Sequence, residues 1–197
     1  MKKKLVVILL SALVVLSIGQ AAFASSNVGL SAGYVGATGT KFFGAEVFGE
    51  YQFSNLFSLG GDLNMGFLDG GSIRGYANLM GKFNIFGTNL FNVGALLNVA
   101  TAYEIYNGVN FSQIHVGPGI YGEVNLFDKL SISATAKFTM LYVELATGAT
   151  TTNFTFKPTS IHLSVSYGIT DNIAIGVKGM YEFGNVYSVG LTAQYNF

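Results

Sequence analysis

The stretch Phe43-Gly44-Ala45-Glu46-Val47-Phe48-Gly49-Glu50-Tyr51-Gln52-Phe53 decides how this chain folds. Every second residue from Phe43 to Phe53 is apolar or small, and most of the residues between them are polar or charged. A repeat of two residues is the signature of a β-strand, because successive side chains of a strand point to opposite sides. The stretch therefore predicts one strand with an apolar face and a polar face.

The same alternation recurs along the chain and predicts ten strands, over residues 27–38, 41–53, 57–68, 73–84, 90–103, 111–127, 130–143, 156–169, 173–183 and 186–197. The count falls to eight if the first hairpin or the 144–160 region is misread. Pro118 lies inside the sixth segment and predicts a bulge or a missing ladder bond, because proline has no N–H to donate. Apolar-polar segments of about ten residues between turn signals are typical of transmembrane β-barrels.

The composition is unusual for a soluble domain. Charged residues make up 10% of the chain, against roughly 25% in typical globular proteins. The chain also has 26 Gly, 17 Phe and 11 Tyr. Past the N-terminal segment, no apolar run approaches the roughly 18 residues of a spanning helix. A hydrophobic chain without such helices can still enter a bilayer by closing a sheet, which pairs every backbone N–H and C=O.

The N-terminal segment has the features of a secretory signal peptide. Lys2, Lys3 and Lys4 precede an apolar run from residue 5 to 18, and Ala22-Phe23-Ala24 matches a small-residue cleavage site. We therefore expect a signal peptide over 1–24 and one barrel domain over 25–197; the alternative is a retained anchor helix. The chain lacks Cys, which excludes disulfides and thiolate metal sites. Residues 25–197 carry seven Lys and Arg against ten Asp and Glu with no basic patch, so nucleic acid is not an expected partner.

Side-chain volume indicates which face of the sheet is turned outward. A soluble barrel of the lipocalin kind would hold the apolar face inside. An eight-stranded barrel leaves an interior just wide enough for its side chains or one small ligand. The apolar faces here supply about five side chains per strand, many of them aromatic, and would overfill even a ten-stranded lumen. We expect an all-β, antiparallel, up-and-down transmembrane barrel with its apolar face toward lipid.

The links between strands alternate in character. Short turns at 54–55, 85–89, 128–129 and 170–172 alternate with links that include two longer ones, 104–110 and 144–155. Short turns are periplasmic and longer loops are external in bacterial barrels. This pattern places both termini in the periplasm. Aromatic residues gather near both strand ends, as in interfacial girdles, with Tyr51, Phe53, Phe57 and Phe83 beside short turns and Tyr34, Phe43, Tyr181 and Phe183 at the other end.

The last segment carries a family resemblance. It has apolar or small residues at alternate positions and ends on phenylalanine, with Val189, Leu191, Ala193, Tyr195 and Phe197 on one face. It resembles the C-terminal signal by which the barrel assembly machinery recognises outer-membrane barrels. Over its whole mature length the chain resembles the small OmpA/OmpX-type barrels, although that group usually has eight strands. The resemblance implies a cell outer-membrane location, with outer-membrane lipids and the assembly machinery as partners. We expect a monomer.

The polar faces predict a lumen with nearly balanced charge. The expected lumen-lining charged residues are Glu46, Glu50, Asp62, Arg74, Lys82, Glu123, Lys137, Lys178 and Glu182. Extrapolated strand registers put Glu46 two strands from Arg74 and Glu50 two strands from Lys82, a span of about 10 Å. We expect ion pairs there, with solvated charges as the alternative. Gly residues on the same faces leave space for a narrow pore that passes water, ions or small solutes, but not for a wide channel.

Two other functions are weighed against the pore. His162 and Ser164 share a face near Glu182, which resembles the residue types of outer-membrane lipid A deacylases, a lipid hydrolase class. No oxyanion hole is identifiable, so we expect no catalytic residues and no enzyme. His115 also faces inward without a supporting set of ligands, so we expect no metal and no cofactor. The remaining alternative is surface binding or adhesion through loops 104–110 and 144–155.

Overall fold

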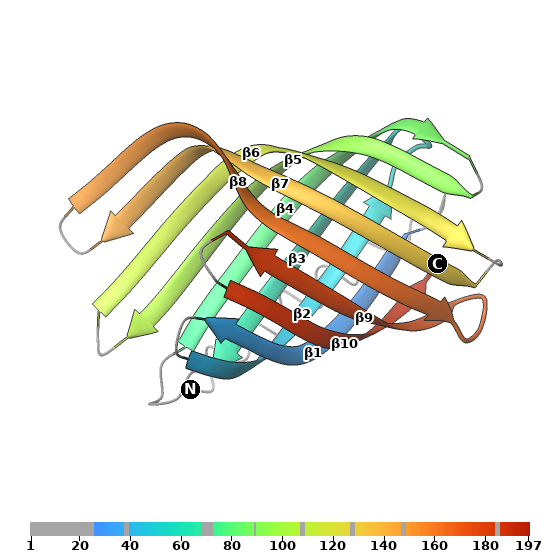
Figure 1. Ribbon diagram of the computed structural model, residues 1–197, viewed down its shortest axis with the longest axis horizontal. Helices are drawn as coiled ribbons and strands as arrows, with labels where there is room; N and C mark the ends of the chain where they lie inside the picture. The colour runs from blue at the N-terminus through green and yellow to red at the C-terminus, as the bar shows by residue number, and fades with distance from the viewer. Residues whose placement is uncertain are drawn as a thin grey trace.

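The computed structural model describes residues 26–37, 40–67, 73–88, 90–106, 109–126, 129–146, 149–183 and 186–197. In these residues the chain forms ten antiparallel strands that close into a barrel, each paired with its neighbours in sequence (Figure 1). Their bounds are β1 Asn27–Ala37, β2 Thr40–Gln52, β3 Phe57–Phe67, β4 Ile73–Gly87, β5 Phe91–Tyr106, β6 Val109–Leu126, β7 Leu130–Ala146, β8 Ala149–Gly168, β9 Ile173–Glu182 and β10 Val186–Asn196. The ten-strand fold is confirmed, and the eight-strand alternative is wrong.

The first and last strands close the barrel. β1 pairs with β10 from Asn27–Asn196 to Gly36–Tyr187. Beyond the ladder, the Phe197 N–H donates to the Ser26 carbonyl at 2.9 Å and the Ser26 N–H donates to the Phe197 carbonyl at 3.2 Å. Closure leaves no free sheet edge along this seam, which is what a sheet needs inside lipid. Among the described residues, no helix is long and apolar enough to cross a bilayer.

The apolar side chains cover the outside of the barrel. Leu191 is 71% exposed, and Leu30, Leu79, Leu97, Ile120 and Leu163 are also exposed. The buried apolar side chains of the described residues are few: Val35, Leu96, Ala100, Ala102 and Ala174. Several polar side chains are buried instead, among them Asn78, Asn98, Lys137 and Thr139. The barrel is thus built with its apolar surface outward, as the volume argument predicted.

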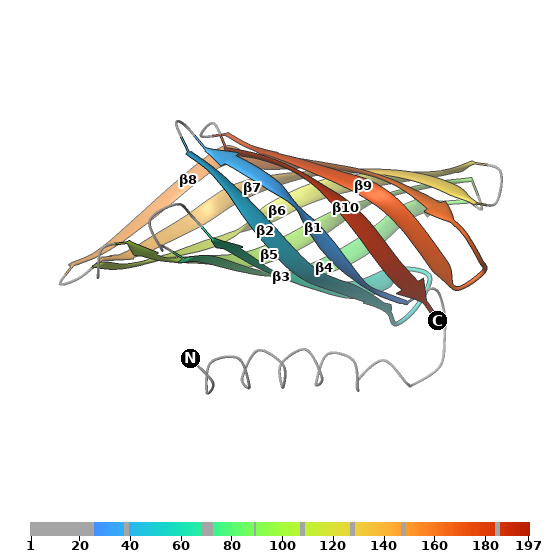
Figure 2. The same ribbon diagram turned by 90° about the horizontal axis from the view of Figure 1, so that it is seen from below.

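The two ends of the barrel differ. Short turns join β2–β3, β4–β5, β6–β7 and β8–β9 at one end, where Ser26 and Phe197 also lie. At the other end, the β5–β6 and β7–β8 hairpins project beyond the remaining strands (Figures 1 and 2). We call these the short-turn end and the hairpin end. The segment 1–24 predicted as a signal peptide lies outside the described residues.

The two predicted loops are largely strand, and this prediction was wrong. β5 runs to Tyr106 and β6 begins at Val109, so most of 104–110 belongs to a hairpin. β7 runs to Ala146 and β8 begins at Ala149, so most of 144–155 pairs in the same way. The tips, 107–108 and 147–148, lie outside the described residues. The Thr-rich segment looked like a loop, but threonine is β-branched and favours strands where a partner strand is present. The surface-binding alternative stays a prediction, and it would use projecting hairpins instead of long loops.

Pro118 lies at a bulge, as predicted. The pairing of β6 with β7 shifts register between Val116 and Gly119. Proline cannot donate to the β7 ladder, so the strand gives up regular pairing at that point. β8 shows a second irregularity next to Pro158, where its register with β7 shifts between Lys137 and Phe138.

Aromatic rings gather at both ends of the outer surface. At the short-turn end, Tyr51, Phe53, Phe57 and Phe83 form a chain of ring contacts with centroid distances of 4.7, 5.6 and 5.1 Å. At the opposite end, the rings of Tyr34 and Phe43 meet edge to face, as do those of Tyr181 and Phe183. Rings at these two levels suit the lipid–water interfaces on either side of an apolar band.

Candidate functional site: the barrel lumen

The inward faces of the strands bring the nine predicted charged residues to the lumen. Glu50, Lys82 and Glu123 line a cavity near the short-turn end, Asp62, Lys137 and Lys178 line the next cavity, and Glu46, Arg74 and Glu182 line a third toward the hairpin end. Because their parity along each strand is opposite to that of the exposed apolar residues, all nine share the barrel interior. The charges are therefore spread along the lumen.

Glu50 and Lys82 form an ion pair across β3. Glu50 lies opposite Gly60 and Lys82 lies opposite Ser58, so no large side chain stands between the two. Ser58 donates a further hydrogen bond to the Glu50 carboxylate at 2.5 Å, and the Lys82 ammonium lies 5.4 Å from the Tyr121 ring centroid. This ion pair is confirmed. Its charges are balanced within the wall, as partly buried charges require.

The predicted pair of Glu46 with Arg74 is wrong, because Glu46 pairs with Lys178. Glu46 lies opposite Asn64, and Asn64 lies opposite Tyr76, so Arg74 is two residues before the β4 position directly across β3 from Glu46. Lys178 approaches from β9, on the other side of the β1–β10 seam. This offset alone does not decide the pairing, because Lys82 is offset by two residues from Glu50 in the same way and still pairs with it.

Two glycines make room for the Glu46–Lys178 pair. Gly190 lies opposite Lys178 on one side and opposite Gly33 on the other. A Cβ on Gly33 would lie 2.2 Å from the Val189 carbonyl oxygen, so this position accepts only glycine. With no side chains along this path, the Lys178 side chain crosses the seam, and its ammonium lies 5.4 Å from the Phe48 ring centroid. The ion pair thus links strands on both sides of the closure.

Other charges in the middle of the lumen have neutral partners or none within ion-pair distance. Asp62 accepts a hydrogen bond from the Asn78 amide at 2.9 Å. Glu123 accepts one from Ser131 at 3.0 Å. Lys137 is only 3% exposed, and within the described part of the chain it belongs to neither ion pair. Its ammonium group is therefore a positive charge outside the two ion pairs, in the cavity that Lys178 also lines.

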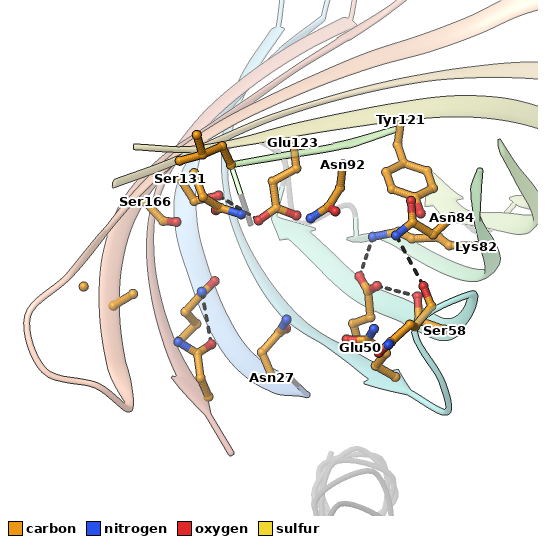
Figure 3. A pocket seen from close by; sticks show the side chains of 18 of the residues that line it. Asn27, Glu50, Ser58, Lys82, Asn84, Asn92, Tyr121, Glu123, Ser131 and Ser166 are labelled. Atoms are coloured by element: carbon orange, nitrogen blue, oxygen red, sulfur yellow. Dashed lines mark hydrogen bonds and ion pairs between the residues drawn. The ribbon is translucent and has the colours of Figure 1, made fainter. Parts of the chain in front are cut away.

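Three of the lumen cavities follow one another along the barrel. The first, of about 730 Å³, opens at the short-turn end (Figure 3). The second, of about 230 Å³, shares Glu50, Lys82 and Tyr121 with the first. The third, of about 60 Å³, shares Asp62, His162 and Lys178 with the second. These cavities become smaller toward the Glu46–Lys178 pair, and the third has room for only a few water molecules.

The first cavity, which we call the vestibule, is lined chiefly by uncharged hydrogen-bonding groups. Eight carboxamide side chains face it: Asn27, Gln52, Asn55, Asn84, Asn92, Asn125, Gln194 and Asn196. Each carboxamide offers both a donor and an acceptor. Figure 3 shows Asn27, Asn84 and Asn92 around the opening, with the Glu50–Lys82 pair and Tyr121 on one wall. The vestibule can thus solvate polar molecules without a strong preference for one sign of charge.

The residues considered for hydrolysis do not assemble as that hypothesis requires. His162 Nε2 hydrogen-bonds with Ser160 Oγ at 2.9 Å, whereas Ser164 Oγ hydrogen-bonds with Ser133 Oγ at 2.8 Å. Glu182 lies opposite Ser160, and His162 lies opposite Met180. His115 is hydrogen-bonded to Thr139 at 3.3 Å. Among the described residues, no three His, Asp or Glu side chains gather as metal ligands would.

Several lumen aromatics were missed by the sequence argument. Tyr121 contacts Lys82, Phe48 contacts Lys178, and Tyr142 donates to Glu144 at 2.6 Å while its ring lies 4.9 Å from that of His115. A signal was present, since Tyr121 is two residues from Glu123 and Phe48 is two residues from both Glu46 and Glu50. Residues at even spacing share a face. These aromatic residues were not predicted in the lumen because aromatic side chains were expected to face outward.

No family model and no curated protein matches the sequence. Among solved structures, the outer-membrane protease OmpT from Escherichia coli is 10% identical and superposes with a TM-score of 0.59 over 91% of this chain and 99% of that one. The translocator domain of the autotransporter NalP from Neisseria meningitidis is 12% identical, with a TM-score of 0.45 over 92% and 91%. The KdgM porin is 9% identical, with a TM-score of 0.44 over 86% and 99%.

At such identities, these similarities concern the fold alone. The OmpT superposition covers almost the whole of both chains and matches the closed antiparallel barrel that the register describes. The chain therefore has the fold of a small outer-membrane β-barrel, a closed antiparallel barrel of ten strands.

Proposed function

We propose that this protein is a narrow passive pore for water, ions and small polar solutes. The observation that carries the proposal is the series of lumen cavities whose volumes fall from about 730 to about 230 and then about 60 Å³. Ten strands are too few for the wide aqueous channel of porins with about 16–18 strands. The Glu46–Lys178 pair lies at the narrow part and acts as the constriction.

The charge pattern favours weak ion selectivity. Glu50 is balanced by Lys82 and Glu46 by Lys178, so each ion pair contributes little net field to the lumen. The vestibule adds carboxamides and serine hydroxyls, which replace water around a solute of either sign or of none. Small uncharged hydrogen-bonding molecules are the solute class that this lining suits best.

The sequence supports a proposed location and orientation of the protein in the membrane. We infer that residues 1–24 are removed on export, that both mature termini lie in the periplasm and that the vestibule opens there. Outer-membrane lipids and the barrel assembly machinery, through Val189, Leu191, Ala193, Tyr195 and Phe197, are the proposed partners of a monomer. Membership of the OmpA/OmpX-type group stays a prediction, as does the absence of enzymatic activity, metal and cofactor.

Single-channel recording on the refolded mature protein tests the pore. We expect small, steady currents from the wild type. The double variant Glu46→Ala/Lys178→Ala should carry larger currents, because it removes both arms of the constriction without leaving an unpaired charge. Val177→Ala, on the lipid-facing surface of the same strand, is the control and should conduct like the wild type.

Two results would contradict the proposal. One is the absence of current above that of the protein-free bilayer in both wild type and double variant, with folding verified by heat-modifiable gel mobility. The other is current in the double variant alone, which would make the ion pair a plug.

A further inference from the structure

The wall formed by β7 and β8 continues past the point where β9 ends. β8 pairs with β9 only from Ser160 to Gly168, but with β7 from Ala149 to Tyr167. We call Phe138–Leu145 of β7 and Thr150–Thr159 of β8 the β7–β8 extension. Figures 1 and 2 show this hairpin reaching beyond the strands on the opposite wall.

One face of the extension is mostly apolar, with Thr150 and Thr152 as its polar residues near the tip, and it is the outer face of the barrel. Leu141 pairs with Val116 on one side and with Phe154 on the other, and Val116 pairs in turn with Val99, which is exposed on the outer surface. Phe156 stacks on Phe138 at 5.2 Å and an interplanar angle of 7°. Phe154 is 84% exposed and Phe156 is 68% exposed. These side chains lie on the same outer surface as Leu163 and Val165, which belong to the lipid-facing belt and lie closer to the short-turn end of β8.

The polar and charged groups of the extension turn to the inner side. The Lys157 ammonium lies 5.5 Å from the Tyr142 ring centroid, and the Tyr142 hydroxyl donates to Glu144. Asn153 lies opposite Tyr142 and so shares that inner face. Among the described side chains of the extension, none on the outer face is charged. A surface meant for water would place its charges on the outside as well.

The height of the apolar surface differs between the two walls. On β9, outward apolar or aromatic residues run from Ile173 to Phe183, which corresponds to about 26 Å along the barrel axis at a usual strand rise and tilt. On β8 they run from Tyr167 to Phe154, or about 34 Å. The apolar band of outer-membrane barrels is about 25 Å tall. The apolar surface on β9 is about as tall as this band, whereas the apolar surface on β8 is taller.

We propose that the outer face of the β7–β8 extension is covered by lipid acyl chains, so that the barrel sits tilted, with its β7–β8 wall leaning into the bilayer. The extension is continuous with the lipid-facing belt, its outer face lacks charge and a barrel taller than the bilayer on one side reduces the mismatch by tilting. A second copy fits less well: two copies inserted in the same direction are related by an axis along the membrane normal, so their tilted β8 strands would cross instead of pairing.

The sequence makes a direct test possible, because the chain contains no tryptophan. Phe154→Trp and Phe156→Trp place a single reporter on the outer face with little change in shape. Leu163→Trp, in the belt, is the lipid-facing control, and Asn153→Trp, on the inner face of the same hairpin, is the water-facing control. Each variant is refolded into phosphatidylcholine vesicles with and without bromine along the acyl chains.

We expect the 154 and 156 reporters to emit at short wavelength and to be quenched by brominated lipid nearly as strongly as the 163 reporter. Quenching no stronger than that of the 153 reporter would overturn the proposal. Short-wavelength emission that brominated lipid does not quench and that changes with the protein-to-lipid ratio would also overturn it, since a second copy would then cover the face.

Discussion

Val177 and Lys178 are neighbours in the chain that meet opposite surroundings. Val177 is exposed on the outside of β9, while the Lys178 ammonium forms its ion pair with Glu46 inside the lumen. The same inversion separates Leu191 from Thr192 on β10, where Leu191 is exposed and Thr192 lines the middle cavity. The effect of a substitution therefore depends first on the parity of its position.

Arginine at two paired strands tests this inversion. Val177→Arg should lower the free energy of unfolding by about 2–4 kcal/mol, because it places a charge near the centre of the lipid-facing band. Thr192→Arg, one strand away and facing a polar cavity, should cost far less. Urea unfolding of both variants in lipid vesicles measures the difference; equal losses would mean that the faces are assigned the wrong way round.

The Glu50–Lys82 pair allows a second prediction, which concerns the ion selectivity of the lumen. Lys82→Met leaves the Glu50 carboxylate without its cation, so the lumen should become cation-selective. Glu50→Gln leaves the Lys82 ammonium without its anion, so the preference should reverse. The double variant restores the balance and should return the reversal potential in a salt gradient to near the wild-type value. A reversal potential that stays the same in both single variants would show that ions do not pass this pair.

At the scale of the strand, alternation located the strands well because it depends only on residues within the same segment. The predicted strand 27–38 is observed as Asn27–Ala37, and 173–183 as Ile173–Glu182. Alternation also gave the face of each charged residue. It could not give register, because a shift of two residues keeps every face and changes every partner. Both predicted pairs are offset by two residues across β3, yet Glu50 does pair with Lys82. Glu46 instead pairs with Lys178 across the β1–β10 seam, a contact between strands that alternation within one strand cannot reveal.

The projecting hairpins could not be predicted for a different reason. Residues 149–159 include Thr150, Thr151, Thr152 and Asn153, whose alternation is weak because both faces are polar or small at the tip. Their strand conformation depends on pairing with β7, and that pairing cannot be inferred from their own alternation. Pro118 was easier, because the missing N–H has a local consequence whatever the partner strand is.

The bulge in β6 gives a prediction at this scale. A Cβ on Gly117 would lie 2.0 Å from the Phe138 carbonyl oxygen, so Gly117→Ala must displace backbone at the bulge. We expect it to cost about 1–3 kcal/mol of unfolding free energy, as overpacking does. Gly122→Ala on the same strand is the control, since its Cβ would meet nothing closer than 3.7 Å. Similar urea midpoints for the two variants would argue against the close approach of β6 and β7.

At the scale of the molecule, stability comes from closure and surroundings more than from a core. Among the residues that the structure describes, the buried apolar side chains are too few to form the core of a soluble domain. Strand pairing closes all the way around the barrel, and most large apolar side chains lie on its outer surface. Because side chains alternate along each strand, the polar residues then face the interior.

Refolding of the mature chain with and without lipid tests this arrangement most directly. In phosphatidylcholine vesicles we expect an inserted, protease-resistant species with heat-modifiable gel mobility and a β-sheet circular dichroism spectrum. In buffer without lipid or detergent we expect aggregation. A folded, monomeric protein that stays in solution without lipid or detergent would contradict the account.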